Sequence, residues 1–192
     1  WPLSWVFSQI GAIPSSYEAA RVALEAGVPI ALFPGSDHDG FRPFWQQGTA
    51  DFGGRLGFLK IARSAWVSVV PMAFTGITAP LVWRSRLLPY LFVWPRLVGV
   101  KRYGLSVLAV LGAVLVMLLL PVAGPWRLLI AWGWAASPLA MVSWLPATIR
   151  IRIGEPIAPE ALFGEQGSAD EARLPEALAT VERAVQGLID AR

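Results

Sequence analysis

The sequence predicts an α/β fold: a mostly parallel sheet with flanking helices, plus an apolar membrane hairpin. Two short apolar runs are the predicted core strands. The run 28–33 stops at a Pro-Gly pair, and the run 67–74 contains a proline near its end. A helical pattern precedes each run, and this alternation with short joints favours parallel pairing through right-handed crossovers. The third observation is the segment 104–146, in which Arg127 is the only charged residue.

The composition is typical of a membrane-associated protein. Of the 192 residues, 55% are hydrophobic and 15% charged, the mean hydropathy is +0.54, and ten residues are tryptophan. A typical soluble domain has roughly a quarter charged residues. The length allows one domain, or one domain with an appended element. With no cysteine and one histidine, the chain can form neither disulfides nor a Cys/His zinc site, so no metal is expected.

The charges are distributed unevenly along the chain. Between Phe52 and Gly154 there are eleven lysine and arginine residues and no aspartate or glutamate. Such a positive middle suits an anionic membrane surface or a phosphorylated ligand. Nucleic acid is a poorer partner, because the basic residues flank apolar runs instead of lining an aromatic, polar face.

Four further elements are predicted along the chain. A helix over 15–26 has capping-box spacing from Ser15 to Glu18 and stops at Gly27. Another helical stretch follows the Gly53-Gly54 pair. The segment 147–153 alternates strictly, which predicts a strand with one apolar and one basic face. Asp170 or the residue before it is the expected cap of a closing helix, whose apolar residues recur at three- and four-residue steps.

The apolar segment predicts a membrane hairpin. The 19-residue run 105–123 would form a helix about 28 Å long, close to the roughly 30 Å hydrocarbon core. A second run covers 128–145, with 124–127 as the tip. Basic residues at both outer ends place those ends on the cytoplasmic side, giving a re-entrant hairpin or two spans. Four tryptophans suit the headgroup belt, although a buried soluble helix could use them as well. They are Trp126, Trp132, Trp134 and Trp144.

Three parts of the chain follow from these elements. Residues 1–103 are the α/β core, 104–146 are the membrane hairpin, and 147–192 are the closing strand and helix of the same domain as the core.

The loop after the first predicted strand is the first candidate for a site, because ligands of α/β sheets bind beyond the carboxyl ends of strands. It carries polar residues, namely Ser36, Asp37, His38, Asp39 and Arg42. The alternative is an ordinary solvated loop. His38 could act as a base beside Asp37 or Asp39, but adjacent loop residues rarely face each other. A His38 that lines the cleft or meets solvent is therefore the favoured alternative. The predicted strands also place Pro34 and Pro71 at one edge.

Four short motifs occur in order: Gly11-Ala12-Ile13-Pro14, Phe33-Pro34-Gly35-Ser36, Val69-Val70-Pro71-Met72 and the stretch 151–157. This order resembles the phospholipid/glycerol acyltransferase superfamily, of the lysophosphatidic acid acyltransferase type, where the first three are similar to the second, third and fourth blocks. The resemblance implies an O-acyltransferase of phospholipid biosynthesis. Such an enzyme moves a fatty acyl group from acyl-CoA or acyl-carrier protein to a glycerolipid-type hydroxyl at the cytoplasmic face of the membrane. It implies no cofactor beyond the donor thioester.

Three blocks depart from the family pattern. The second lacks the arginine used for an acceptor phosphate and has Ser15 and Ser16 instead. The first block, a His-x-x-x-x-Asp dyad that removes the proton of the acceptor hydroxyl, is absent. In the family it precedes the second block, so we expect it upstream of Trp1, in a chain that is amino-terminally truncated and inactive alone. The third block, Pro34-Gly35-Ser36-x-x-Asp39, is closer to the Pro-Gly-Gly-x-x-Glu of the neutral-acceptor branch, which includes diacylglycerol acyltransferases. Arg42 could restore a phosphate contact, or it could cover the loop as a surface arginine.

The resemblance thus implies a substrate-binding set with no catalytic residue in this chain. The cleft residues are Phe33, Pro34, Gly35, Ser36, Asp39 and Arg42, and the wall residues are Gly11, Ile13, Pro14 and Pro71. The main alternative is a non-catalytic, membrane-associated α/β binding module. A thioesterase or other lipid hydrolase needs a nucleophile and base that the sequence does not reveal.

Overall fold

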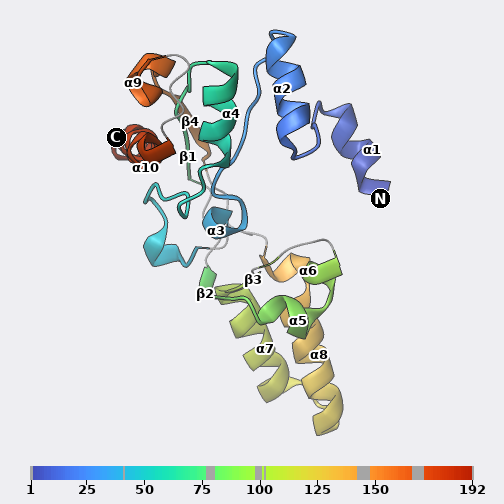
Figure 1. Ribbon diagram of the computed structural model, residues 1–192. Helices are drawn as coiled ribbons and strands as arrows, with labels where there is room; N and C mark the ends of the chain where they lie inside the picture. The colour runs from blue at the N-terminus through green and yellow to red at the C-terminus, as the bar shows by residue number, and fades with distance from the viewer. Residues whose placement is uncertain are drawn as a thin grey trace. The chain divides into compact units, whose positions relative to one another are not determined.

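Figure 1 shows the computed structural model, which describes residues 2–40, 42–76, 81–97, 101, 103–141, 148–165 and 171–191. Within these ranges the chain is mostly helical, with two small antiparallel two-stranded sheets. The residues fall into two compact units. The first contains Trp1–Pro34, Gly54–Pro71 and Ile153–Ala184, and the second contains Gly35–Gly53, Met72–Arg152 and Val185–Arg192.

Seventeen elements are present in the described part of the chain. The α-helices are α1 (Pro2–Gln9), α2 (Tyr17–Glu25), α3 (Ser36–Gly40), α4 (Gly57–Ala65), α5 (Leu88–Phe92), α6 (Trp94–Leu97), α7 (Val107–Leu119), α8 (Gly124–Ala136), α9 (Pro159–Phe163) and α10 (Leu174–Asp190). The strands are β1 (Met72–Thr75), β2 (Leu81–Ser85), β3 (Tyr103–Ser106) and β4 (Arg150–Ile153), and the short 3-10 helices are η1 (Phe44–Gln46), η2 (Pro138–Met141) and η3 (Glu171–Arg173).

The predicted parallel α/β sheet is wrong. Residues 28–33 form no strand, and Val28 and Phe33 are exposed. The run 67–74 becomes a strand only from Met72, after Pro71, and this strand pairs with β4. A short apolar run indicates that a segment can be buried, but it does not indicate which other segment pairs with it. Because there is no sheet edge at 28–33, Pro34 and Pro71 do not mark the ends of two parallel strands.

Helices α2 and α4 pack against each other in the first unit. The Ser16 side chain caps α2 by accepting a hydrogen bond from the backbone N–H of Ala19, 3.2 Å away. The predicted helix over 15–26 is thus confirmed, with the cap one residue later than Ser15. The helix predicted after Gly53-Gly54 is confirmed as α4, which ends at Trp66 in a left-handed conformation.

The core of the first unit joins α4, α9 and α10. Leu59 of α4 has no exposed surface, and Phe163 and Leu174 are nearly as well buried. The closing helix is confirmed: the residues spaced at three- and four-residue steps on α10 are the buried ones. The predicted cap at Asp170 lies outside the described residues. At the surface, Glu171 lies 3.3 Å from the ammonium of Lys60 and 3.7 Å from the guanidinium of Arg63.

The second unit is built around Tyr103, which starts β3. Strands β2 and β3 pair antiparallel, so Ser85 lies opposite Tyr103. The Tyr103 ring makes edge-on contacts with Phe92 and Trp94, at centroid distances of 5.6 and 5.5 Å. Leu88 and Ala136 complete this cluster. Burial raises the pKa of Tyr103 to about 12.

The prediction that the hairpin spans a membrane is wrong. The segment does form a helical hairpin, α7 and α8, but each helix has 13 residues, and β3 and the Ser106 cap take the start of the predicted 19-residue run. The predicted tip 124–127 is instead the first turn of α8. Among the residues that the structure describes, no helix combines the length and the apolarity that crossing a bilayer requires. The last part of the second apolar run, 142–145, lies outside the described residues.

Strand β4 lies within the segment 147–153, where a strand was predicted. The apolar face of this strand is not buried, because Ile149, Ile151 and Ile153 are all more than half exposed. The basic face instead holds Arg152, whose guanidinium donates to the Leu188 carbonyl at 3.0 Å. Alternation therefore predicted the element, but not which face packs.

Candidate functional site

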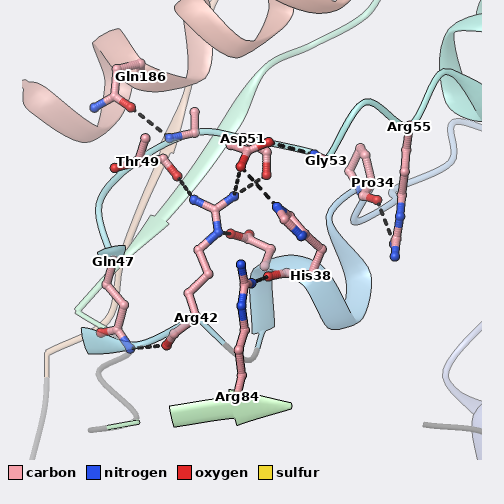
Figure 2. A network of polar contacts seen from close by, with 12 residues as sticks. Pro34, His38, Arg42, Gln47, Thr49, Asp51, Gly53, Arg55, Arg84 and Gln186 are labelled. Carbon is pink, nitrogen blue, oxygen red and sulfur yellow. Dashed lines mark hydrogen bonds and ion pairs between the residues drawn. The ribbon is translucent and has the colours of Figure 1, made fainter. Parts of the chain in front are cut away.

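The candidate site is the loop Gly35–Gly53, which lies wholly in the second unit (Figure 2). It starts as the short helix α3, where the backbone N–H of His38 donates to the Gly35 carbonyl at 2.9 Å. A Cβ atom on Gly35 would lie 2.4 Å from Cβ of Asp39, so only glycine allows this close approach. Ser36 has a φ of 44°, a left-handed conformation that is uncommon for residues other than glycine.

Arg42 organises the loop. Its residue is only 4% exposed, and its guanidinium donates to the backbone carbonyls of Thr49 and Asp51. Its Nε lies 3.2 Å from the Asp39 carboxylate, and one Nη lies 3.5 Å from the Asp51 carboxylate. Arg42 is therefore neither a surface arginine nor an open phosphate ligand, because its planar fork is engaged by groups of the same loop.

His38 pairs with Asp51, thirteen positions further along the chain. Its Nε2 lies 3.0 Å from an Asp51 carboxylate oxygen, and its side chain is 16% exposed. The ring lies against Gly53, where a Cβ atom would come within 3.1 Å of it. Asp39 faces Arg42 instead, and the side chain of Asp37 lies outside what the structure describes. For His38 and Asp39, the geometry agrees with the expectation that neighbouring loop residues do not face each other.

The loop is tied to two other elements of the second unit. The side chain of Gln186, on α10, accepts a hydrogen bond from the Ala50 N–H at 2.7 Å and donates to the Gly48 carbonyl at 3.0 Å. Arg84, on β2, donates to the His38 carbonyl at 2.7 Å. Figure 2 shows Gln186 and Arg84 reaching the loop from different elements. Both its centre and its start are thus held in place.

The electrostatics of the loop favour an ionised Asp51. The hydrogen bond from His38 lowers the pKa of this carboxyl group most, followed by the backbone N–H of Gly53, which donates to it at 2.7 Å, and by the charge of Arg42. An imidazole held by a carboxylate is the arrangement that orients a general base. In the described part of the chain, no three or more His, Asp or Glu side chains gather as a metal site would require.

The other predicted site residues lie in the first unit. Phe33 is 71% exposed, and the Pro34 carbonyl accepts a hydrogen bond from Arg55 at 3.2 Å. Gly11, Ile13 and Pro14 form the joint between α1 and α2, where Gly11 has a φ of 78°. The Pro71 carbonyl accepts from the Gly154 N–H at 2.8 Å. The structure thus brings Gly35, Ser36, Asp39 and Arg42 together in one loop, and it places Gly11, Ile13 and Pro14 together in the joint between α1 and α2.

Sequence reasoning missed Asp51 and Gln186. Asp51 had a local signal: an aspartate two residues before a glycine is typical of an Asx turn, and its side chain does accept from the Gly53 N–H. Gln186 had none, because it lies on the polar side of a helix and its partners are more than a hundred residues away.

Three comparisons with known proteins were made for this chain. No family model matches it, and no curated protein sequence and no solved structure does so either.

Proposed function

We propose that this chain is part of an acyltransferase that moves a fatty acyl group from a thioester donor to a lipid hydroxyl. The proposal rests on the ordered sequence motifs and on the loop that begins in the Phe33-Pro34-Gly35-Ser36 motif. It does not rest on the fold, because the α/β sheet that the resemblance implies is not the observed architecture. The main structural support for the proposal is the loop Gly35–Gly53. The buried Arg42 side chain at its centre donates hydrogen bonds to two backbone carbonyls of the loop.

The state of Arg42 supports a neutral acceptor. A phosphorylated acceptor needs a cation whose donors are open to the ligand. The guanidinium of Arg42 is instead turned to two carbonyl groups and two carboxylates of its own loop. This agrees with the pattern Pro34-Gly35-Ser36-x-x-Asp39, which is similar to the neutral-acceptor branch. We therefore propose an acceptor such as diacylglycerol over one such as lysophosphatidic acid.

The proposed reaction is simple acyl transfer. The acceptor oxygen forms a bond to the thioester carbonyl carbon, the carbon–sulfur bond breaks, and a base carries the hydroxyl proton to the leaving thiolate. The resemblance places this base in a His-x-x-x-x-Asp dyad ahead of the Gly11 motif. The His38–Asp51 pair is the other candidate base, because its geometry has the same two groups.

The test uses the complete gene product with a labelled acyl-CoA. We expect labelled ester with diacylglycerol as acceptor, and much less with lysophosphatidic acid. A preference for the phosphorylated acceptor would overturn the assignment of acceptor class. Release of free acid alone would identify a hydrolase, and lipid binding without turnover would identify the non-catalytic module; either result would overturn the acyltransferase.

His38→Gln tells the two candidate bases apart. Glutamine can still donate a hydrogen bond to Asp51, so the loop is kept while the imidazole is lost. We expect this variant to retain most of the transfer activity, because the proposed base lies in the upstream dyad. A loss of a hundredfold or more in a folded variant would assign the base to His38 instead.

A further inference from the structure

The α7–α8 hairpin is held rigidly at its base and along its seam. The Ser106 side chain accepts from the Ala109 N–H at 2.9 Å and donates to the Ala140 carbonyl, which joins β3, α7 and η2. Along the seam the indole N–H of Trp134 donates to the Leu108 carbonyl at 3.0 Å. The two helices therefore form one body with a defined outer surface.

That outer surface is apolar apart from the half-buried Arg127, whose Nε donates to the Val122 carbonyl at 2.7 Å. Every exposed residue of α7 and α8 is apolar or glycine, and the exposed side chains occur on successive turns instead of along one stripe. They include Leu111, Leu115, Leu118, Trp126, Leu129 and Trp132. A helix that is apolar all round requires an apolar environment on all sides. Water does not provide such an environment. Exposed apolar patches of this kind mark binding surfaces.

The charges around the hairpin identify what covers it. Arg86, Arg96 and Lys101 are exposed on the segments that lead into β3 and α7, and the sequence between Phe52 and Gly154 contains no acidic residue. A protein partner of one helix face would leave the other faces uncovered, and a protein interface has a polar rim that this hairpin lacks. Apolar turns with a cationic base, and with tryptophans at 41% and 61% exposure, are complementary to an anionic lipid surface.

We propose that the α7–α8 hairpin docks the second unit onto an anionic lipid bilayer. The hairpin enters one leaflet without crossing the membrane. A 13-residue helix is about 20 Å long, against a roughly 30 Å hydrocarbon core. The basic base meets the lipid headgroups. This inference is independent of the proposed acyl transfer, because its test contains no acyl donor.

The test uses the absence of cysteine, which allows one environment-sensitive fluorophore to be attached at one engineered position. The fluorophore is nitrobenzoxadiazole (NBD). On the hairpin it is attached to Leu118→Cys on α7 or to Leu129→Cys on α8. Ala179→Cys, on the exposed side of α10, is the control. Vesicles of phosphatidylcholine with about one third phosphatidylglycerol supply the anionic surface.

On vesicles we expect NBD emission to rise severalfold and to shift to the blue at both hairpin positions, with no change at position 179. Unchanged emission at both hairpin positions would overturn the proposal. A rise without vesicles that grows with protein concentration, together with a doubled mass by light scattering, would overturn it in favour of a second copy as the occupant.

A set of polar variants provides the matched comparison. Leu111→Gln, Leu118→Gln and Leu129→Gln in one chain should weaken vesicle partitioning at least tenfold, because each removes apolar area from the docking surface. The control chain carries Ile10→Gln, Val22→Gln and Val28→Gln, which are equally exposed in the first unit. Its partitioning should change less than twofold. Equal weakening in both chains, with unchanged circular dichroism, would contradict the assignment of the surface to the hairpin.

Discussion

Arg42 has a structural part in the loop that its charge alone does not suggest. A lysine in its place would keep the charge, but an ammonium group cannot reach two carbonyl groups and two carboxylates from one planar fork. The Thr49 and Asp51 carbonyls would lose a charged donor, and hydrogen bonds to charged groups are among the stronger ones. The loop Gly35–Gly53 therefore depends on the shape of this side chain as well as on its sign.

We expect Arg42→Lys to lower the free energy of unfolding by about 1 to 3 kcal/mol. The control is Arg86→Lys, an exposed position, where the change should stay within about 0.5 kcal/mol. Urea unfolding followed by circular dichroism measures both. Equal stability of the two variants would mean that the guanidinium contacts do not stabilise the loop.

Asp51 makes the stability of the loop depend on pH. Its pKa is lowered in the folded protein, chiefly by the hydrogen bond from His38. The ionised carboxylate thus stabilises the fold at pH values above about 4, and this contribution is lost as the pH falls through the lowered pKa. We expect the difference in melting temperature between the wild type and Asp51→Asn to shrink below about pH 4.

The control for this pH series is the same substitution in a His38→Ala background. Alanine removes the hydrogen bond that lowers the pKa of Asp51 most, so the dependence on pH should be weaker there. A difference between wild type and Asp51→Asn that is the same at every pH would contradict the assigned cause.

At the scale of single residues, the sequence drew attention to polar residues of this loop but did not reveal which of them pair. His38, Asp39 and Arg42 were identified by type and position, and all three take part in the polar network. Their partners depended on how the chain returns through Thr49 and Asp51. That return is set by Arg42 and by glycine turns, and nothing in residue types alone encodes it.

The seam of the α7–α8 hairpin depends on Gly112. A Cβ atom at this position would lie 2.0 Å from Nε1 of Trp134, far inside van der Waals contact. Either the indole or one helix must then move, and the hydrogen bond from Trp134 to the Leu108 carbonyl is lost. Gly133, on the other helix, has nothing within 4 Å of such an atom.

These two glycines form a matched pair for mutation. We expect Gly112→Ala to destabilise the protein by about 1 to 3 kcal/mol through overpacking. Gly133→Ala should be neutral or stabilising by up to about 1 kcal/mol, because alanine has the higher helix propensity. Urea unfolding curves of both variants provide the measurement. If both variants were equally stable, the helices would not be packed as described.

At the scale of elements, helices with their own local signals and the alternating strand at 150–153 were predicted, whereas the strand predicted at 28–33 was wrong. The helix α2 has a serine cap and a glycine stop, and α10 has a long amphipathic repeat, so each is specified by nearby residues. The run 28–33 depended on a partner strand, which the structure does not provide. Pairing is a property of two distant segments, and a single apolar run carries no information about the second one.

For the whole molecule, the uneven charge has a larger effect than the net charge of +3. The eleven basic residues without acidic neighbours, from 53 to 153, make the middle of the chain attractive to anionic surfaces, while the acidic residues lie outside it. The small net charge of the whole chain does not reveal this asymmetry. The electrostatic part of lipid binding should therefore respond to salt.

We expect the vesicle-bound fraction to fall severalfold when salt rises from about 50 mM to about 500 mM, because exposed charges are screened. Binding to purely zwitterionic vesicles should change little with salt. Sedimentation with each type of vesicle measures the two fractions. A salt response that is the same for both would contradict a role for the basic residues.

The two hydrogen bonds between the Gln186 side chain and the loop have a consequence for how the protein is synthesised and folds. Its partners Ala50 and Gly48 precede it by 136 and 138 positions. A ribosome therefore exposes the loop long before it delivers the residue that secures it, at about 5–20 residues per second. During this interval the nascent loop contains Arg42 but lacks the hydrogen bonds to Gln186. A chain ended before Gln186 would keep the polar residues of the loop and lose the last step of its assembly.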